Sequence, residues 1–227
     1  MALYAIGDLH LSLNSNKPMD IFGEGWHNYV ERIREGFSTL TDEDVTVLCG
    51  DLSWGMSLEE SLEDFRFIDA LPGKKILMKG NHDYWWNTAA KMTKFFEEHE
   101  LTTLSLLHNN CLFYGDKAIC GTRGWITEPG QQSDIKVLNR EVGRLKASLE
   151  SCKAEEKIVF LHYPPVFGNI ECNEITQVLA ENNIKTCYYG HLHGYAHRLA
   201  VHDEERNGTR FFLASADFTG FTPIRIL

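Results

Sequence analysis

Five times along the chain, a short apolar run of the kind found in buried β-strands ends in a polar block of glycine, aspartate, asparagine or histidine. The blocks are Gly7-Asp8-Leu9-His10, Gly50-Asp51, Gly80-Asn81-His82-Asp83, Leu161-His162 and Gly190-His191-Leu192-His193. Continuous apolar runs are typical of strands covered on both faces, and such sheets carry functional residues where their strands end. We therefore expect the blocks to gather at one sheet edge.

Strand-like and helix-like segments alternate along the chain. Apolar runs predict strands at residues 3–6, 45–49, 75–78, 101–107, 111–114, 117–120, 158–161, 186–189, 196–202, 210–215 and 221–226. Amphipathic spacing predicts helices at residues 26–40, 57–71, 85–99, 133–152 and 174–182. The order is βαβαβ at first, and the shorter strands that follow predict a second, more antiparallel sheet.

Length and composition favour one domain. A chain of 227 residues with 43% hydrophobic content is long enough for one sizeable core, so residues 1–227 are expected to form a single domain. The first residues lack a basic leader and run directly into Gly7-Asp8, unlike a secretory signal. No segment approaches the roughly 18 unbroken apolar residues of a membrane span. We expect neither secretion nor a membrane partner.

The cysteines and the net charge restrict which compartment and which classes of partner are expected. The six cysteines show no CxxC spacing, and Cys49, Cys120 and Cys187 lie in apolar runs where buried thiols are common. A reducing cytoplasm fits this usage. The 22 basic and 32 acidic residues give a formal net charge of −10, which repels polyphosphate backbones. A dedicated nucleic-acid partner is therefore not expected.

The residue types in the polar blocks are those that hold divalent metals. Residues i and i+2 of an extended strand point to one side, so Asp8 with His10, and His191 with His193, are each expected to present two ligands to a common site. The glycines that precede the blocks permit close approach of the backbone. Imidazole with oxygen ligands suits manganese, iron or zinc better than calcium.

In this order the blocks resemble the signature of the calcineurin-like metallophosphoesterase superfamily, which is DxH, GD, GNH(D/E), H and GHxH. The resemblance spans Asp8 to His193, and a chance match to every block is far rarer than a match to one. It implies an α/β fold of four layers, α/β/β/α, in which two mixed β-sheets are flanked by helices. The match is closer to compact bacterial-type phosphoesterases than to protein phosphatases, whose GDxxDRG arginine is absent after Gly50-Asp51.

The resemblance also implies a site for two divalent ions, with manganese expected first and iron or zinc next. One ion would be held by Asp8, His10, Asp51 and His193, and the other by Asp51, Asn81, His162 and His191. The implied reaction is hydrolysis of a small phosphate monoester or diester, in which a hydroxide that bridges the ions attacks phosphorus. The sequence leaves the choice between monoester and diester open.

Two residues of the third block receive catalytic roles from the resemblance. His82 would contact a phosphate oxygen and protonate the leaving group, while Asp83 beside it would orient the ring. Asp83 has an alternative role as the cap of the helix expected near Trp85.

Substrate contacts are less constrained by the sequence. Trp85 follows the catalytic histidine and could grip a base, sugar or aryl group, although a hydrophobic staple for the next helix is slightly favoured. Arg123 follows a strand and is either aimed at a phosphate oxygen or placed at the surface. Trp54 and Trp125 carry the same ambiguity as Trp85. Among the histidines outside the blocks, His197 is the first candidate for the site because it follows the last block closely.

Two other classes of function stay open from the sequence. A non-catalytic scaffold would be indicated by a replaced ligand or a missing His82, and all of these residues are present. A metal-dependent nuclease is disfavoured by the acidic balance and by the lack of a basic stripe interleaved with aromatic residues. The favoured conclusion is a metal-dependent phosphoric ester hydrolase.

Overall fold

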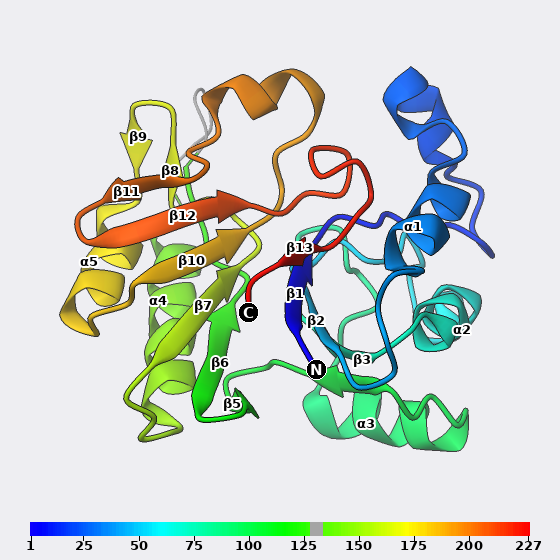
Figure 1. Cartoon of the computed structure of the whole chain (residues 1–227), viewed down its shortest axis with the longest axis horizontal. Helices are drawn as coiled ribbons and strands as arrows, with labels where there is room; N and C mark the ends of the chain where they lie inside the picture. The colour runs from blue at the N-terminus through cyan, green and yellow to red at the C-terminus, as the bar shows by residue number, and fades with distance from the viewer. Residues whose placement is uncertain (128–133) are drawn as a thin grey trace.

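Two β-sheets lie face to face at the centre of the structure, a computed structural model that describes residues 1–127 and 134–227 (Figure 1). The first sheet has the strand order β13 (Ile224–Arg225), β1 (Leu3–Ile6), β2 (Val45–Leu48), β3 (Lys74–Leu77) and β4 (Leu104–Leu106). The second has the order β11 (Glu204–Arg206), β12 (Thr209–Leu213), β10 (Thr186–Tyr189), β7 (Lys157–Leu161), β6 (Lys117–Thr122) and β5 (Cys111–Tyr114). A separate hairpin joins β8 (Val166–Phe167) to β9 (Ile170–Glu171).

Helices cover the outer face of each sheet. Beside the first sheet lie α1 (Tyr29–Phe37), α2 (Leu62–Ala70) and α3 (Ala89–Glu98), and beside the second lie α4 (Ile135–Glu150) and α5 (Asn173–Glu181) (Figure 1). Short 3-10 helices are η1 (Met19–Phe22), η2 (Glu24–Trp26) and η3 (Gly194–Leu199). The arrangement confirms the predicted α/β fold of two mixed sheets flanked by helices. No helix in the described ranges has both the length and the apolar surface to cross a bilayer.

Apolar side chains fill the three interfaces between these four layers. Val47 and Phe160 pack between the two sheets, Phe65 packs between the first sheet and its helices, and Leu145 packs between the second sheet and its helices. Every residue of β2 is buried, as expected for a strand covered on both faces. Burial of each large apolar side chain stabilises the fold by about 1.5–3 kcal/mol, which is why the central strands are continuous apolar runs.

Parallel pairing aligns the carboxyl ends of the central strands. The last residues of neighbouring strands are register partners, namely Ile6, Leu48 and Leu77 in the first sheet and Thr122, Leu161 and Tyr189 in the second. An isolated parallel bridge between Gly7 and Ser215 joins the two sheets at this edge. The loops that follow the strands of both sheets therefore meet in one place.

The second sheet differs from the prediction of a more antiparallel sheet. Strands β6, β7, β10 and β12 are parallel to one another, and antiparallel pairing is confined, within the described residues, to the edge strands β5 and β11. The helices α4 and α5 supply the long crossover connections that parallel neighbours require. The strand predicted at 196–202 is also wrong, because the chain turns back after the last polar block as the 3-10 helix η3.

Capping residues shorten two of the predicted helices. The Thr88 side chain accepts the N–H of Lys91, so α3 begins at Ala89 and not at residue 85. The Asp134 carboxylate accepts the N–H of Val137 and starts α4. Residue 133, the predicted start of that helix, lies outside the described residues. Both side chains satisfy an N–H group of the first helical turn, which has no partner within the helix.

Candidate metal centre

The seven residues predicted as metal ligands all meet where the two sheets are joined. Each follows a parallel strand: Asp8 and His10 follow β1, Asp51 follows β2, Asn81 follows β3, His162 follows β7, and His191 and His193 follow β10. The first sheet thus supplies the carboxylates and the amide, while the second supplies most of the imidazoles. The carboxyl ends of parallel strands are the usual position for a functional site in a sheet of this kind.

Short distances between donor atoms show this convergence. Nε2 of His10 lies 3.2 Å from Nε2 of His193, which in turn lies 3.4 Å from Oδ1 of Asp8. On the other side of the site, Nε2 of His162 lies 3.6 Å from Oδ2 of Asp51. These side chains come from positions far apart in the sequence, so only the tertiary fold brings their lone pairs together.

Asn81 connects the remaining imidazoles. Its Oδ1 lies 2.6 Å from Nε2 of His162 and 2.9 Å from Nδ1 of His191. The backbone N–H of His191 lies 3.0 Å from both carboxylate oxygens of Asp8 and donates to them. Amide oxygen, carboxylate and imidazole donors are thereby held within one small space.

Two groups of three side chains each place their donor atoms within 4.8 Å of one another in the described part of the chain. The groups are Asp8, His10 and His193, and Asp8, Asp51 and His162. The first is contained in one of the ligand sets that the resemblance implies. The second combines residues of both sets and makes Asp8 the common member, whereas the resemblance gives that position to Asp51.

The backbone of the site is not the extended chain that the i, i+2 argument assumes. Asp8, His10, Asp51 and His191 have φ values of 60°, 46°, 53° and 72°, in the left-handed region. Residues other than glycine rarely adopt such angles, and each costs about 1–3 kcal/mol that the surrounding structure must offset. The prediction of paired ligands on a strand face is therefore wrong. Each pair converges because the chain turns sharply just beyond the strand end.

Two glycines leave room for the carboxylates. A Cβ atom on Gly80 would overlap Oδ1 and the backbone nitrogen of Asp51, and one on Gly190 would overlap Oδ2 of Asp8. These two glycines are needed because the loop after β3 approaches the loop after β2, and the loop after β10 approaches the loop after β1, too closely for a side chain.

Burial makes the site a strong receptor for cations. Burial, assisted by the neighbouring imidazoles of His193 and His191 respectively, lowers the pKa of His10 and of His162 well below the usual range. Burial together with the nearby carboxylates of Asp83 and Asp8 raises the pKa of Asp51. Neutral imidazoles that face crowded, buried carboxylates are a nitrogen and oxygen donor set that divalent cations of the manganese, iron and zinc type fit.

Asp217, which the sequence analysis missed, holds His193. Oδ1 of Asp217 lies 2.9 Å from Nδ1 of His193, and Oδ2 lies 3.3 Å from Nε2 of His197. Burial opposes protonation of His193, but its contacts with Asp217 and Asp8 outweigh that effect and raise its pKa to about 10. Asp217 follows β12, so its position at a strand end was the one available sequence signal. A carboxylate behind a metal-binding imidazole fixes the ring and increases its basicity.

His82 lies at the rim of the site with its ring available. Its backbone N–H donates to Oδ1 of Asp51 over 2.8 Å, and its ring packs against Trp54 with 4.5 Å between centroids. Nδ1 of His82 is buried and has no hydrogen-bond partner within residues 1–127 and 134–227. Trp54 also stacks on His10 at 5.0 Å and packs against the hydrophobic core, so it lies next to the site.

Asp83 has a different role from the predicted one. Its Oδ2 accepts the N–H groups of Asp51 and Gly80 over 2.9 and 2.7 Å, and its Oδ1 accepts the N–H of Leu52 over 2.8 Å and Nε1–H of Trp85 over 3.0 Å. It therefore ties the loop after β2 to the loop after β3. The expectation that it orients the His82 ring is wrong, and so is the alternative of a helix cap.

The two residues predicted to contact the substrate lie in different environments in the structure. Trp85 is 1% exposed and packs against Phe65 of α2 with 4.7 Å between ring centroids, so the interpretation as a substrate contact is wrong. Arg123 follows β6, and its guanidinium lies 3.3 Å from the buried carboxylate of Glu141. Its side chain is 15% exposed and lines a small cavity where β3, β4 and β6 end, so it is not a free surface arginine. Trp125 packs against Tyr163.

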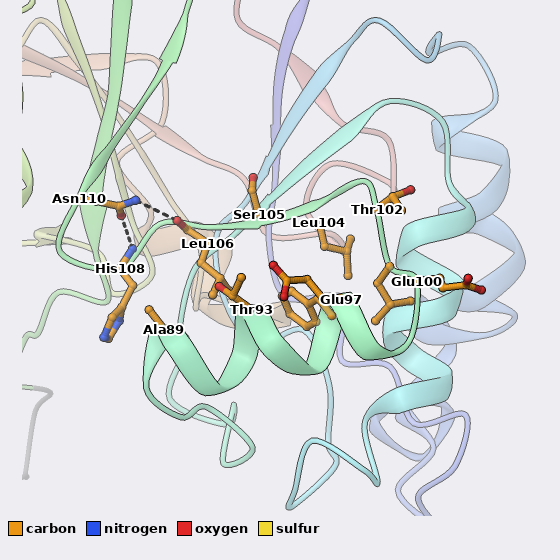
Figure 2. Close-up of a pocket in the computed structure, with 12 residues that line it drawn as sticks. Ala89, Thr93, Glu97, Glu100, Thr102, Leu104, Ser105, Leu106, His108 and Asn110 are labelled. Atoms are coloured by element: carbon orange, nitrogen blue, oxygen red, sulfur yellow. Dashed lines mark hydrogen bonds between the residues drawn. The ribbon is translucent and has the colours of Figure 1, made fainter.

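A cavity of about 830 Å³ between α3 and β4 contains none of the predicted site residues. Figure 2 shows its lining, with Thr93 and Glu97 on the helix and Leu104 on the strand. Asn110 closes one end by accepting the N–H of His108 and donating to the carbonyl of Leu106 (Figure 2). The wall is apolar and acidic, so it does not attract a phosphate.

Comparisons with known proteins agree with this site. The sequence model of the calcineurin-like phosphoesterase family matches residues 1–195. A phosphopantetheinyl hydrolase from Mycobacterium tuberculosis has a similar structure, with a TM-score of 0.61 and 13% identity over 100% of this chain and 95% of that chain. A protein of unknown function from Aquifex aeolicus has a TM-score of 0.54 and 16% identity over 99% and 95% of the two chains. No match is found among curated protein sequences.

Likeness at such low identity shows the fold alone, whereas the family match covers most of the chain and includes every polar block. The donor groups around Asp8 fit a metal-dependent reaction of the kind that family catalyses. The chain therefore belongs to the calcineurin-like phosphoesterase family and is a metal-dependent phosphoric ester hydrolase.

Proposed function

We propose that the protein hydrolyses a small phosphate monoester or diester with the help of two divalent ions held at the joined edge of its sheets. The observation that carries this proposal is the convergence of four imidazoles, two carboxylates and one amide in a space where two donor groups share Asp8. A single ion with tetrahedral or octahedral coordination does not use seven protein donors.

Two ions fit these donors as the resemblance implies. Asp8, His10 and His193 would hold one ion, and Asn81, His162 and His191 would hold the other, with Asp51 between them. When bound, the ions would neutralise phosphate charge and lower the pKa of a coordinated water. Manganese is our first choice for the ions, with iron and zinc as alternatives, because the donors are nitrogen and oxygen without thiolate.

His82 is proposed as the group that protonates the leaving oxygen. Burial, with the neighbouring His191, lowers its pKa in the free protein, but a bound phosphate anion acts in the opposite direction and favours the protonated ring. Its Nδ1 atom is buried, but the ring as a whole is only half-buried and can contact a substrate oxygen through its exposed edge. Asp83 supports this step indirectly, because it fixes the loop on which His82 and Asn81 lie.

The partner and the compartment also belong to this proposal. The substrate is expected to be a small phosphorylated molecule, and a membrane or nucleic-acid partner is not expected from the charge of −10. All six cysteines are free thiols, which agrees with a reducing cytoplasm. The single-domain organisation over residues 1–227 stays a prediction.

The test is hydrolysis of p-nitrophenyl phosphate and bis-p-nitrophenyl phosphate by metal-stripped protein with manganese, zinc, magnesium or no ion added. We expect an added ion to restore activity, and the preferred reagent to separate monoester from diester chemistry. Metal content is measured in parallel on Asp51→Asn, His82→Ala and the exposed control His27→Ala. Asp51→Asn should lose both metal and activity.

His82→Ala should retain its metal and lose about 100-fold to 10,000-fold in turnover with a poor leaving group. The loss should be smaller with p-nitrophenolate, which needs little protonation to leave. His27→Ala should match the wild-type protein in metal content and turnover, because its side chain is exposed and outside the site. Equal metal loss in Asp51→Asn and His82→Ala would contradict the division of roles.

A further inference from the structure

A second polar cavity, of about 280 Å³, lies where β3, β4 and β6 end. Its wall carries three cationic side chains, Lys79, Arg123 and Arg144, together with the polar residues Asn87, His108 and Asn109. No acidic side chain lines it within residues 1–127 and 134–227. We call this space the cationic pocket. Among the described residues, His108 is the one residue that it shares with the acidic cavity of Figure 2.

One buried carboxylate lies behind this group of cations. Glu141 of α4 is fully buried, and its Oε1 lies 3.3 Å from Nη2 of Arg123 and 2.8 Å from Nη1 of Arg144. Its other oxygen accepts the hydroxyl of Thr122 over 2.8 Å. A single carboxylate that pairs with two guanidinium groups leaves the pocket wall with positive charges that it does not neutralise.

Two donors that line the pocket have no hydrogen-bond partner among the described residues. Nζ of Lys79, the first of them, forms no hydrogen bond or ion pair there. An oxyanion in the pocket would give this ammonium group an acceptor and an opposite charge. Nε1–H of Trp86 donates to Nδ1 of His108, which leaves Nε2 of that ring as a further donor.

The cationic pocket is directly connected to the metal centre by the backbone. Lys79 precedes the predicted ligand Asn81 by two residues, a separation of at most about 7 Å between Cα atoms. The carbonyl of Arg123 accepts the N–H groups of His162 and Tyr163 over 3.1 and 2.8 Å. The pocket and the metal centre are therefore built on the same loop after β3 and on loops that are hydrogen-bonded to each other after β6 and β7.

We propose that the cationic pocket binds a second anionic group, phosphate or carboxylate, of the substrate whose scissile phosphate lies at the metal centre. This assignment rests on the proposed function and narrows the substrate to a phosphate ester that carries two anionic groups. Guanidinium groups form paired, charge-assisted hydrogen bonds with such oxyanions, and the ammonium group of Lys79 adds a mobile point charge. Arg123 then contacts the substrate through its second anion and not through its scissile phosphate.

The experiment compares propyl phosphate with propanediol bisphosphate, which have the same kind of leaving group and differ in the second anion. The reconstituted enzyme is assayed by phosphate release, and the ratio of kcat/KM for the bisphosphate to that for the monophosphate is measured. Lys79→Gln and Arg144→Gln should each lower this ratio about tenfold, the effect of one charge-assisted hydrogen bond. Arg140→Gln is the control, since Arg140 also lies on α4 and 4.0 Å from Glu141 but outside the pocket.

The control variant should leave the ratio within about twofold of the wild-type value, as expected for an exposed ion pair. An unchanged ratio in both Lys79→Gln and Arg144→Gln would overturn the assignment. Thermal unfolding of each variant identifies a folding defect, and Lys79→Gln is decisive because its ammonium group forms no hydrogen bond or ion pair with the described residues.

Binding of inorganic pyrophosphate to metal-free protein, measured by calorimetry, tests the pocket without activity. We expect weaker binding in Lys79→Gln and wild-type binding in Arg140→Gln. If the enzyme hydrolyses neither ester, the proposed function fails, while the calorimetry still decides whether the pocket is an oxyanion site. If pyrophosphate binding depends on Lys79 but the kinetic ratio does not, the ligand is a free oxyanion and the substrate assignment is overturned.

Discussion

Replacing Asp83 with asparagine is expected to destabilise the fold strongly. Its two oxygens accept the backbone N–H groups of Asp51, Leu52 and Gly80 and the indole N–H of Trp85. Asparagine keeps one oxygen, so in either orientation its amide group faces at least two of these donors and leaves them without an acceptor. Hydrogen bonds to a charged group contribute about 1.5–3 kcal/mol each, which gives a loss of about 3–6 kcal/mol in the free energy of unfolding.

The loss is measured by urea unfolding of metal-free protein followed through tryptophan fluorescence. For a chain of this length, the same change corresponds to a fall in Tm of roughly 6–24 °C. Asp116→Asn is the matched control, because Asp116 is exposed in the turn between β5 and β6. Its effect should stay within about 0.5 kcal/mol of zero.

A small effect of Asp83→Asn would refute this reasoning. If the variant unfolded within about 1 kcal/mol of the wild-type protein, the carboxylate would not be the anchor of the two loops. If turnover fell while stability did not change, the result would support the role predicted from the sequence, in which Asp83 orients the His82 ring. Loss of stability together with metal affinity is the outcome that the contacts of Asp83 predict.

The remaining predictions rest on single contacts. Gly80→Ala should abolish metal binding in a folded or partly folded protein, because a Cβ atom at this position overlaps Asp51, and metal analysis after dialysis checks this result. Asp217→Asn should weaken metal binding about 10–100-fold, measured by competition with a chelator, because it removes the carboxylate that fixes His193. In the wild-type protein, metal affinity should rise from pH 6 to pH 9, because the pKa of His193 is raised and the ion must displace a proton from this ring. Calorimetry measures the number of protons released on metal binding. This number should be smaller in Asp217→Asn. Protonated His193 also stabilises the metal-free protein, because its pKa is higher in the folded chain than in the unfolded chain. This contribution to the free energy of unfolding is complete below about pH 6.5 and is lost as the pH rises toward 10, which unfolding at several pH values tests. Trp85→Phe should cost about 1–3 kcal/mol of stability through the lost indole hydrogen bond while leaving the KM for the p-nitrophenyl esters unchanged, because Trp85 is buried in the core.

The sequence by itself determined the layers of the fold and the candidate donor residues. Runs such as Val45–Leu48 are apolar at nearly every position because both faces of the strand are covered, and that local pattern needs no knowledge of the partner strand. The polar blocks stand out because carboxylate, amide and imidazole side chains directly after a buried strand have few structural explanations. Each of these signals lies within a few consecutive residues, so it can be recognised from the sequence alone.

The tertiary structure alone decided how those residues are held. The left-handed backbone at Asp8 and His191 replaces the extended geometry that residue spacing suggested, and neighbouring loops stabilise it. Asp83 binds backbone groups more than thirty residues away, Asp217 reaches His193 from another strand, and Glu141 brings two arginines to one pocket. The second sheet is parallel at its centre, and two of the crossovers between its parallel strands run through α4 and α5. Each of these features depends on contacts between segments that are distant in the sequence. Hydrophobic periodicity indicates which face of a helix or strand is buried, but it does not indicate which distant side chain packs against that face.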